Sequence, residues 1–208
     1  MRSREIEDYK KGLHLSSIQR SILVGLLLGD GHLEAQNGGK TYRLKVEHSV
    51  QQKDYVDWLY NQFKDWVRTG PKLRKEGKSY GFTTYSHSSF RFYGQQFYKS
   101  KLKVIPKIIG KLLTPLSLAI WFMDDGSLKS KKHQTYNIHT LGYTKHDLIV
   151  VTEALKKKFG LNSALHKQKT KFLRIYIPSK SAKKFREIVS PYILLGIEYK
   201  LGNIKPKK

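Results

Sequence analysis

The sequence has no cysteine among its 208 residues. A disulfide bond or a thiolate metal site is therefore excluded, which suits a reducing interior without establishing one. It also lacks an apolar run of about 18 residues, the length needed to span a membrane. The first twelve residues mix both charge signs, so they predict neither a secretory signal nor an organelle transit peptide. The eight histidines have no spacing typical of a zinc site, and no glycine-rich phosphate loop is present.

Positive charge is what the chain has in excess, with 40 Lys and Arg against 16 Asp and Glu and a formal net charge of +24. This imbalance favours a polyanionic partner, because cations that neutralise phosphates release condensed counterions. Hydrophobic residues make up 39% of the chain, so we expect a folded protein and not a basic tail. Composition alone fits a ribosomal protein as well as an enzyme that acts on DNA.

Two apolar stretches, residues 23–31 and 118–126, share one pattern. Each has no polar side chain for about two helical turns and then ends in Asp-Gly. A helix that is apolar on every side belongs in a core or against another such helix, and glycine commonly follows the last helical residue. If the two helices pack together, Asp30 and Asp125 are expected to emerge side by side.

The spacing of apolar residues predicts the order helix, hairpin, helix, hairpin, helix twice. The expected elements cover residues 18–30, 32–48, 53–66, 72–85 and 90–98, and then 115–125, 127–141, 144–159, 163–177 and 179–188. Equivalent residues, such as Asp30 and Asp125 or Lys103 and Lys200, stand about 95 positions apart. We therefore expect a duplication, with residues 1–108 as the first half and residues 109–208, including a basic tail, as the second.

Two carboxylates at a pseudo-two-fold centre would repel each other unless a cation lay between them. Mg²⁺ is commonly held by one or two carboxylates together with substrate phosphate oxygens. At a phosphodiester, such ions activate water and stabilise the leaving oxygen. Two equivalent acids suit two scissile phosphates, one on each strand of a duplex.

Both apolar stretches resemble the motif of the LAGLIDADG homing endonucleases, in the monomeric branch with two motifs per chain. Residues 114–126 are typical of the second motif, and residues 103–106 and 199–201 resemble the segments that carry the active-site lysines. The resemblance covers residues 16–203. It implies an α+β fold of tandem αββαββα repeats, with two antiparallel sheets forming a DNA-binding saddle around a central two-helix interface.

The resemblance also implies the site residues. Asp30 and Asp125 would be the catalytic, metal-binding acids, assisted by the backbone carbonyls of Gly29 and Asp124. Two lysines, Lys103 and Lys200, would stabilise charge or organise the attacking water. The expected cofactor is Mg²⁺, as two or three divalent ions, with Mn²⁺ able to substitute and Ca²⁺ binding without efficient cleavage.

The chain departs from this pattern at two places. The third motif position is Gly25 in the first stretch but Ile120 in the second, so close helix contact there is not symmetric. The strand position that often contacts metal or water is Glu47 in the first half, and Leu141 is its expected counterpart. Since a leucine side chain cannot bind metal or water, we expect two unequal cleavage sites.

Basic and polar residues of the predicted strands are candidates for DNA contact, although only about half of a strand's side chains can face a groove. Arg and Lys can pair with guanine and Asn with adenine, but most cations bind phosphate. The candidates are Arg43, Lys45, Lys72, Arg74, Lys78, Tyr80 and Arg91 in the first half, and Lys129, Lys131, His133, Asn137, His139, Lys167, Lys169, Lys171 and Arg174 in the second.

The leading hypothesis is a monomeric, metal-dependent and site-specific endonuclease for double-stranded DNA, with no membrane association. A second hypothesis is an RNA-binding intron maturase, and a third is a DNA-binding regulator without catalysis. Cleavage, intron splicing and metal-independent binding would distinguish the three. Relatives of this type occur in chloroplast and mitochondrial introns and in bacteria, so we expect an organelle or the bacterial cytoplasm.

Overall fold

A computed structural model describes residues 3–168 and 172–202 of the chain. Its helices are α1 (Ser3–Lys11), α2 (Ser17–Leu28), α3 (Lys53–Phe63), α4 (Arg91–Phe97), α5 (Ile109–Leu112), α6 (Pro115–Asp125), α7 (Lys145–Phe159) and α8 (Ser179–Val189). Its strands are β1 (His32–Gln36), β2 (Thr41–Ser49), β3 (Lys72–Arg74), β4 (Ser79–Thr83), β5 (Tyr98–Lys99), β6 (Leu102–Lys103), β7 (Gly126–Ser130), β8 (Thr135–His139), β9 (Ala164–Gln168) and β10 (Phe172–Ile177).

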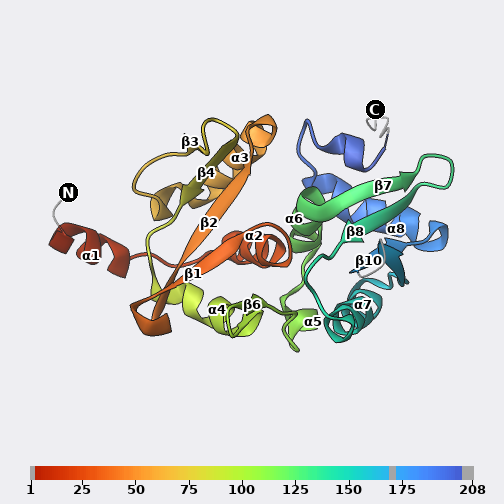
Figure 1. Ribbon diagram of the computed structural model, residues 1–208, viewed down its shortest axis with the longest axis horizontal. Helices are drawn as coiled ribbons and strands as arrows, with labels where there is room; N and C mark the ends of the chain where they lie inside the picture. The colour runs from red at the N-terminus through yellow and green to blue at the C-terminus, as the bar shows by residue number, and fades with distance from the viewer. Residues whose placement is uncertain (1–2, 169–171, 203–208) are drawn as a thin grey trace. The chain divides into compact units, whose positions relative to one another are not determined.

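The same element order occurs twice, as α2-β1-β2-α3-β3-β4-α4 and as α6-β7-β8-α7-β9-β10-α8 (Figure 1). Each copy has a four-stranded antiparallel sheet, with strand orders β1-β2-β4-β3 and β7-β8-β10-β9. The two sheets therefore have the same topology, and the expected α+β fold of tandem αββαββα repeats is confirmed.

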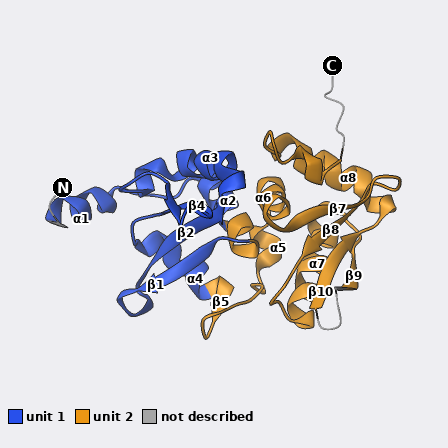
Figure 2. Ribbon diagram, turned by 45° about the horizontal axis from the view of Figure 1, so that its top comes forward, with its two compact units in different colours: residues 1–23, 30–95 blue, residues 24–29, 96–208 orange. Residues whose placement is uncertain are grey.

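The chain divides into two compact units (Figure 2). Unit 1 contains residues 1–23 and 30–95, and unit 2 contains residues 24–29 and 96–208. The last turn of α2 thus belongs to the same unit as α6. Asp30, two residues after the end of α2, begins the segment that belongs to unit 1, and the first strand of that unit starts at His32.

Each sheet has one face covered by helices and one polar face. In unit 1, α3 packs on β2 and β4, where Leu44, Val46 and Phe82 are buried. In unit 2, rings from α6, β8 and α8 meet, with Phe122 and Phe185 in edge-to-face contact at 5.1 Å. Because side chains alternate along a strand, the intervening polar residues lie on the opposite face.

Three helices begin at the capping residues that the sequence predicts. Ser16 Oγ accepts from Gln19 N at the start of α2, and Thr114 forms a capping box with Ser117 at the start of α6, which has proline in its first turn. The predicted capping box of Thr144 and Asp147 opens α7. Short side-chain acceptors just before an apolar run were therefore reliable indicators of where helices begin.

The end of α6 differs from the expectation that glycine caps the helix. Gly126 has φ −80° and ψ 153°, which is extended backbone and not the left-handed cap that glycine often provides. It is glycine for a steric reason, because a Cβ there would overlap the ring and carbonyl of Phe122. The terminal carbonyls of α2 and α6 accept hydrogen bonds from side chains of distant segments instead.

Two glycines let α2 and α6 approach closely within unit 2. A Cβ on Gly25 would lie 2.5 Å from Ile120 Cβ, and one on Gly29 would lie 2.6 Å from Asp124 Cβ. Real Cβ atoms do not approach so closely, so the large side chains of α6 occupy the space that the glycines leave. The expected packing of these helices is confirmed here, and it pairs small residues with large ones.

The strand register shows that one predicted equivalence between the two halves, that of Glu47 with Leu141, is wrong. Gly126 pairs with Ile138, and His32 pairs with Lys45, so counting back one position from His32 sets Gly31 against Val46. Aligning the two glycines makes His139 the counterpart of Glu47. Leu141 is not that counterpart, because β8 ends at His139 and Leu141 lies beyond it, exposed.

Neither α1 nor the small β5–β6 hairpin, in which Tyr98 pairs with Lys103, was expected from the sequence. Among the helices that the described residues form, none has the length and apolar character to cross a membrane.

Candidate functional site

Asp30 follows the apolar part of α2, and its carboxylate lies near a buried histidine. His48 Nδ1 is 3.7 Å from Asp30 Oδ2. The imidazole of His48 is fixed against the ring of Tyr55, with centroids 5.1 Å apart, while the Asp30 side chain keeps 52% of its exposure. The Asp30 carboxylate therefore has an imidazole neighbour and remains accessible to a ligand.

Asp124 and Asp125 end α6 in unit 2. Asp124 is 9% exposed, and its side chain fills the space beside Gly29. Asp125, the last residue of α6, is partly exposed. Asp125, like Asp30, stands directly before a glycine, although α6 ends at Asp125 and α2 ends two residues before Asp30.

The two predicted active-site lysines contact the ends of these helices. Lys103 Nζ donates to the Gly29 carbonyl at 2.5 Å. Lys200 Nζ donates to the carbonyls of Met123 at 2.5 Å and Asp124 at 2.9 Å. The last carbonyls of a helix lack partners in the helix and carry partial negative charge, so a cation is stabilising there. Each lysine is thereby held beside an Asp-Gly junction.

Tyr143 is a second donor at the end of α2, and it was not expected from the sequence. Its hydroxyl donates to the carbonyls of Leu27 at 3.2 Å and Leu28 at 3.1 Å. Burial, and to a lesser extent the nearby Asp125 carboxylate, raise the pKa of Tyr143 well above its usual value. The phenol therefore stays protonated and remains a donor.

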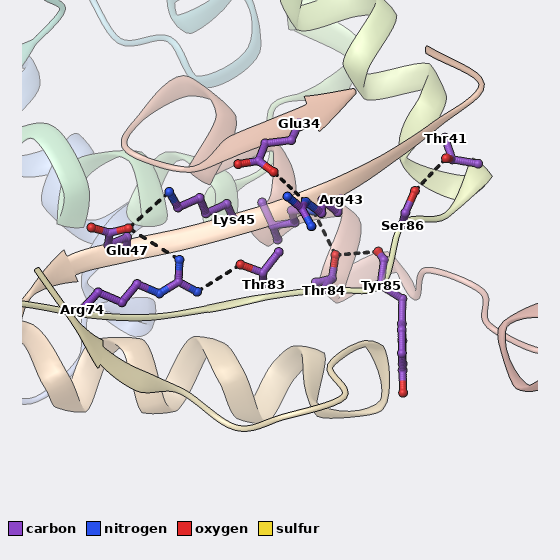
Figure 3. A network of polar contacts seen from close by, with 11 residues as sticks. Glu34, Thr41, Arg43, Lys45, Glu47, Arg74, Thr83, Thr84, Tyr85 and Ser86 are labelled. Atoms are coloured by element: carbon purple, nitrogen blue, oxygen red, sulfur yellow. Dashed lines mark hydrogen bonds and ion pairs between the residues drawn. The ribbon is translucent and has the colours of Figure 1, made fainter. Parts of the chain in front are cut away.

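Glu47 lies on the polar face of the first sheet within a cluster of cations (Figure 3). Its carboxylate is 2.7 Å from Lys75 Nζ, 3.4 Å from Lys45 Nζ and 3.7 Å from Arg74 Nη1, and it accepts from Ser79 Oγ at 2.9 Å. The hydrogen bond from Lys75 is the main reason why the pKa of Glu47 falls to about 2. Glu47 is therefore ionised and already engaged by its neighbours.

The polar face of the first sheet carries several of the predicted DNA contacts. Arg43 and Lys45 alternate with buried residues on β2, and Lys72 and Arg74 occupy the same face of β3 through their register with Gly81 and Ser79. Lys78 lies in the β3–β4 turn. Tyr80 points to the helix side, where its hydroxyl donates to Asp57 at 2.9 Å. Arg91 is the first residue of α4, the short helix expected over residues 90–98, and so does not lie on a strand.

The polar face of the second sheet has a similar set. Lys129 Nζ lies 4.3 Å from the ring centroid of Tyr176, whose ring stacks on His166. Neither Tyr176 nor His166 was among the predicted contacts, although the alternation of Tyr176 with Ile175 and Ile177 on β10 could have indicated its face. Asn137 lies on this face but is only 4% exposed.

The remaining predicted contacts of the second half are distributed as follows. His139 and Arg174 pair directly across β8 and β10 on the polar face. Lys131 and His133 lie in the β7–β8 turn, and Lys167 lies on the opposite face, in register with Leu173. Lys169 and Lys171 lie outside the described residues.

Sequence comparisons place this arrangement in a family. The model of the LAGLIDADG DNA endonuclease family matches residues 20–185. Probable intron-encoded endonuclease 1 of Wickerhamomyces canadensis is 32% identical, with 96% of this chain and 90% of that protein covered. Cytochrome b mRNA maturase bI2 of Saccharomyces cerevisiae is 34% identical over 88% of this chain, but the match covers only 47% of that longer protein.

The fold has a close structural relative as well. The homing endonuclease I-WcaI, solved bound to its DNA recognition sequence, matches with a TM-score of 0.87 and 30% identity. The match covers 96% of this chain and 92% of that one. The repeated motif, the repeated sheet and the match to the family model all agree. The chain therefore belongs to the LAGLIDADG family of DNA endonucleases.

Proposed function

We propose that this protein is a homing endonuclease that acts as a single chain and hydrolyses one phosphodiester bond on each strand of a long, partly asymmetric DNA site. The observation that carries the proposal is the doubled junction of an apolar helix, Asp-Gly and a strand, with a lysine ammonium on the terminal carbonyls of each helix. A protein that only bound DNA would have no need of this repeated arrangement of acid and lysine.

Asp30 and Asp125 are the proposed catalytic acids, and the residues present fit a divalent cation. Carboxylate and carbonyl oxygens are the ligands that Mg²⁺ prefers, and the half-exposed carboxylate of Asp30 has room for one. The carbonyl oxygens of Gly29 and Asp124 would assist in binding the ion. Each accepts a hydrogen bond from a lysine with one lone pair and would bind the ion with its second. A divalent ion held there would supply an activated water and stabilisation of the leaving oxygen. Mg²⁺ is the proposed ion, with Mn²⁺ as a substitute and Ca²⁺ supporting binding alone.

Lys103 and Lys200 would stabilise the negative charge that develops on the phosphate. Both are held in place by helix carbonyls and are partly buried, so little ordering is needed when the duplex binds. The polar faces of the two sheets would hold the duplex, chiefly through phosphate contacts from Arg43, Lys45, Lys129 and Arg174.

Glu47 is proposed as an auxiliary catalytic group that contacts water or metal once DNA phosphates compete for its cations. The corrected register supports a similar group in the second half, because His139 occupies the equivalent position. His139 Nε2 lies 3.1 Å from Ser127 Oγ. Both halves then carry a polar side chain at this position, although the two differ in charge.

The test is cleavage of a plasmid library by the purified protein, with Asp30→Asn and Asp125→Asn as variants. The wild-type protein should make double-strand breaks at one family of sites when Mg²⁺ is present. Each variant should lose cleavage and keep DNA binding, since the amide preserves shape but not charge. Unchanged cleavage in both variants would refute the assignment of the acids.

A maturase activity is the second candidate, and the similarity to the yeast cytochrome b maturase favours it. An intron splicing assay with the same preparations separates the two activities. Splicing support without DNA cleavage would make the protein a maturase, and metal-independent binding without nicking would make it a regulator. The intron-related names of its relatives favour an organelle as its compartment.

A further inference from the structure

The end of α2 has an unusual need for hydrogen-bond donors. Leu27 and Leu28 are 0% and 1% exposed, so water does not reach them freely. The last four carbonyls of an α-helix have no partner within the helix, and a buried carbonyl without a donor is costly. The Tyr143 hydroxyl meets this need by donating to both the Leu27 and Leu28 carbonyls, at 3.2 Å and 3.1 Å.

Tyr143 is itself held firmly. It directly precedes Thr144, whose backbone and side chain join Asp147 in the capping box of α7. The same Asp147 carboxylate accepts from Ile105 N at 3.2 Å, close in sequence to Lys103. One rigid corner of unit 2 therefore carries both the phenol and the segment of the lysine that donates to Gly29.

The first sheet offers no equivalent tyrosine. The corrected register aligns Thr140 with His48, so the counterpart of Tyr143 is Gln51, which is exposed in a short 3₁₀ turn. At the end of α6, Lys200 donates to the Met123 and Asp124 carbonyls. The end of α2, which leads to Asp30, therefore has a tyrosine hydroxyl as a hydrogen-bond donor, whereas the end of α6 has the ammonium of Lys200.

We propose that Tyr143 is a positioning residue for the catalytic acid Asp30. Its buried hydroxyl fixes the last turn of α2, and through it the direction in which the chain presents Asp30. This inference rests on the proposed nuclease function and adds a residue that does not touch DNA or metal.

The test is Tyr143→Phe, which removes the hydroxyl and keeps the ring. In the metal-free protein, hydrogen exchange should speed up at the amides of residues 27–31 and stay unchanged in β9 and β10. With Mg²⁺, the single-turnover cleavage rate should fall about tenfold, the usual effect of losing a group that orients a ligand. DNA affinity measured with Ca²⁺ should stay within about twofold, because the hydroxyl makes no contact with the duplex. Nicked plasmid should accumulate, since one acid is displaced more than the other.

Two control variants make the result specific. Tyr9→Phe removes another tyrosine hydroxyl that donates to a backbone carbonyl, that of Asp65, at 2.8 Å in unit 1. Val151→Ala lowers stability through a buried residue of α7. Both controls should cleave at the wild-type rate when assayed well below their unfolding temperatures, and neither should accelerate exchange at residues 27–31.

Wild-type cleavage rates and wild-type exchange in Tyr143→Phe would overturn the inference while leaving the nuclease assignment intact. A rate loss matched by Val151→Ala would also overturn it, because a general loss of stability would then be sufficient. Failure of the wild-type protein itself to cut DNA would count against the proposed function instead.

Discussion

At the scale of single residues, Gly25 shows how little room the contact between α2 and α6 leaves. A Cβ there would lie 2.5 Å from Ile120 Cβ and 2.6 Å from the Ser117 carbonyl oxygen. Gly25→Ala should therefore lower the free energy of unfolding by about 1–3 kcal/mol, the usual cost of overpacking. Urea unfolding followed by circular dichroism measures this change.

Gly110→Ala is the matched control for Gly25→Ala. Its Cβ would meet only Ala154 Cβ at 3.7 Å, an ordinary contact, so stability should stay the same or rise slightly. Adding Ile120→Ala to Gly25→Ala should cost less than the two single changes predict together, because the new methyl fills part of the space that isoleucine leaves. Equal losses in Gly25→Ala and Gly110→Ala would contradict this packing.

The sequence could predict some site residues and not others, for physical reasons. Asp30 and Asp125 were predictable because an acid at the end of an all-apolar helix is a local pattern. Tyr143 was not, because its partners Leu27 and Leu28 are more than a hundred positions away. The counterpart of Glu47 was misassigned because a bulge between Leu128 and Ser130 and different hairpin lengths change the offset between the repeats.

At the scale of elements, the Glu47 cluster connects three strands of the first sheet. The carboxylate on β2 contacts Ser79 at the start of β4, Arg74 at the end of β3 and Lys75 in the turn between them. Because the pKa of Glu47 is lowered from 4.5 to about 2, its contribution to stability is present above pH 4.5 and is lost as the pH falls towards 2.

Glu47→Gln should therefore lower the free energy of unfolding at pH 7 by at most about 3 kcal/mol. The difference from wild type should shrink between pH 4.5 and about 2, which thermal unfolding across this range would show. Glu34→Gln is the control, because Glu34 makes one ion pair with the partly exposed Arg43 and should contribute at most about 1 kcal/mol. A difference that stayed constant with pH would mean that charge is not the cause.

Element prediction succeeded where a long periodic pattern exists. The helices of both repeats and their hairpins were predictable from apolar spacing and capping residues. The β5–β6 hairpin has strands of two residues, which are too short to show alternation, and yet it carries Lys103. The ends of α2 and α6 depend on donors from distant segments, so local glycine rules described them poorly.

At the scale of the whole molecule, a net charge of +24 should make DNA binding strongly dependent on salt. If about six phosphates are neutralised, affinity for a duplex should fall about a thousandfold between 50 mM and 200 mM salt. Fluorescence anisotropy with a labelled duplex measures the slope of log affinity against log salt.

A pair of double variants locates the cations that produce this slope. Lys129→Ala with Arg174→Ala should reduce the slope by about 2, because both residues lie on the polar face of the second sheet. Lys156→Ala with Lys157→Ala removes the same charge from the exposed last turn of α7 and should leave the slope nearly unchanged. Equal reductions would show that binding does not depend on the sheet face.

The pairing of glycine with isoleucine in the contact between α2 and α6 has a consequence for how this gene can be divided. Two copies of the second half would bring isoleucine against isoleucine, and two copies of the first would leave a gap between glycines. Neither half can replace the other as a self-associating subunit. A split version should therefore work only when both fragments are expressed together.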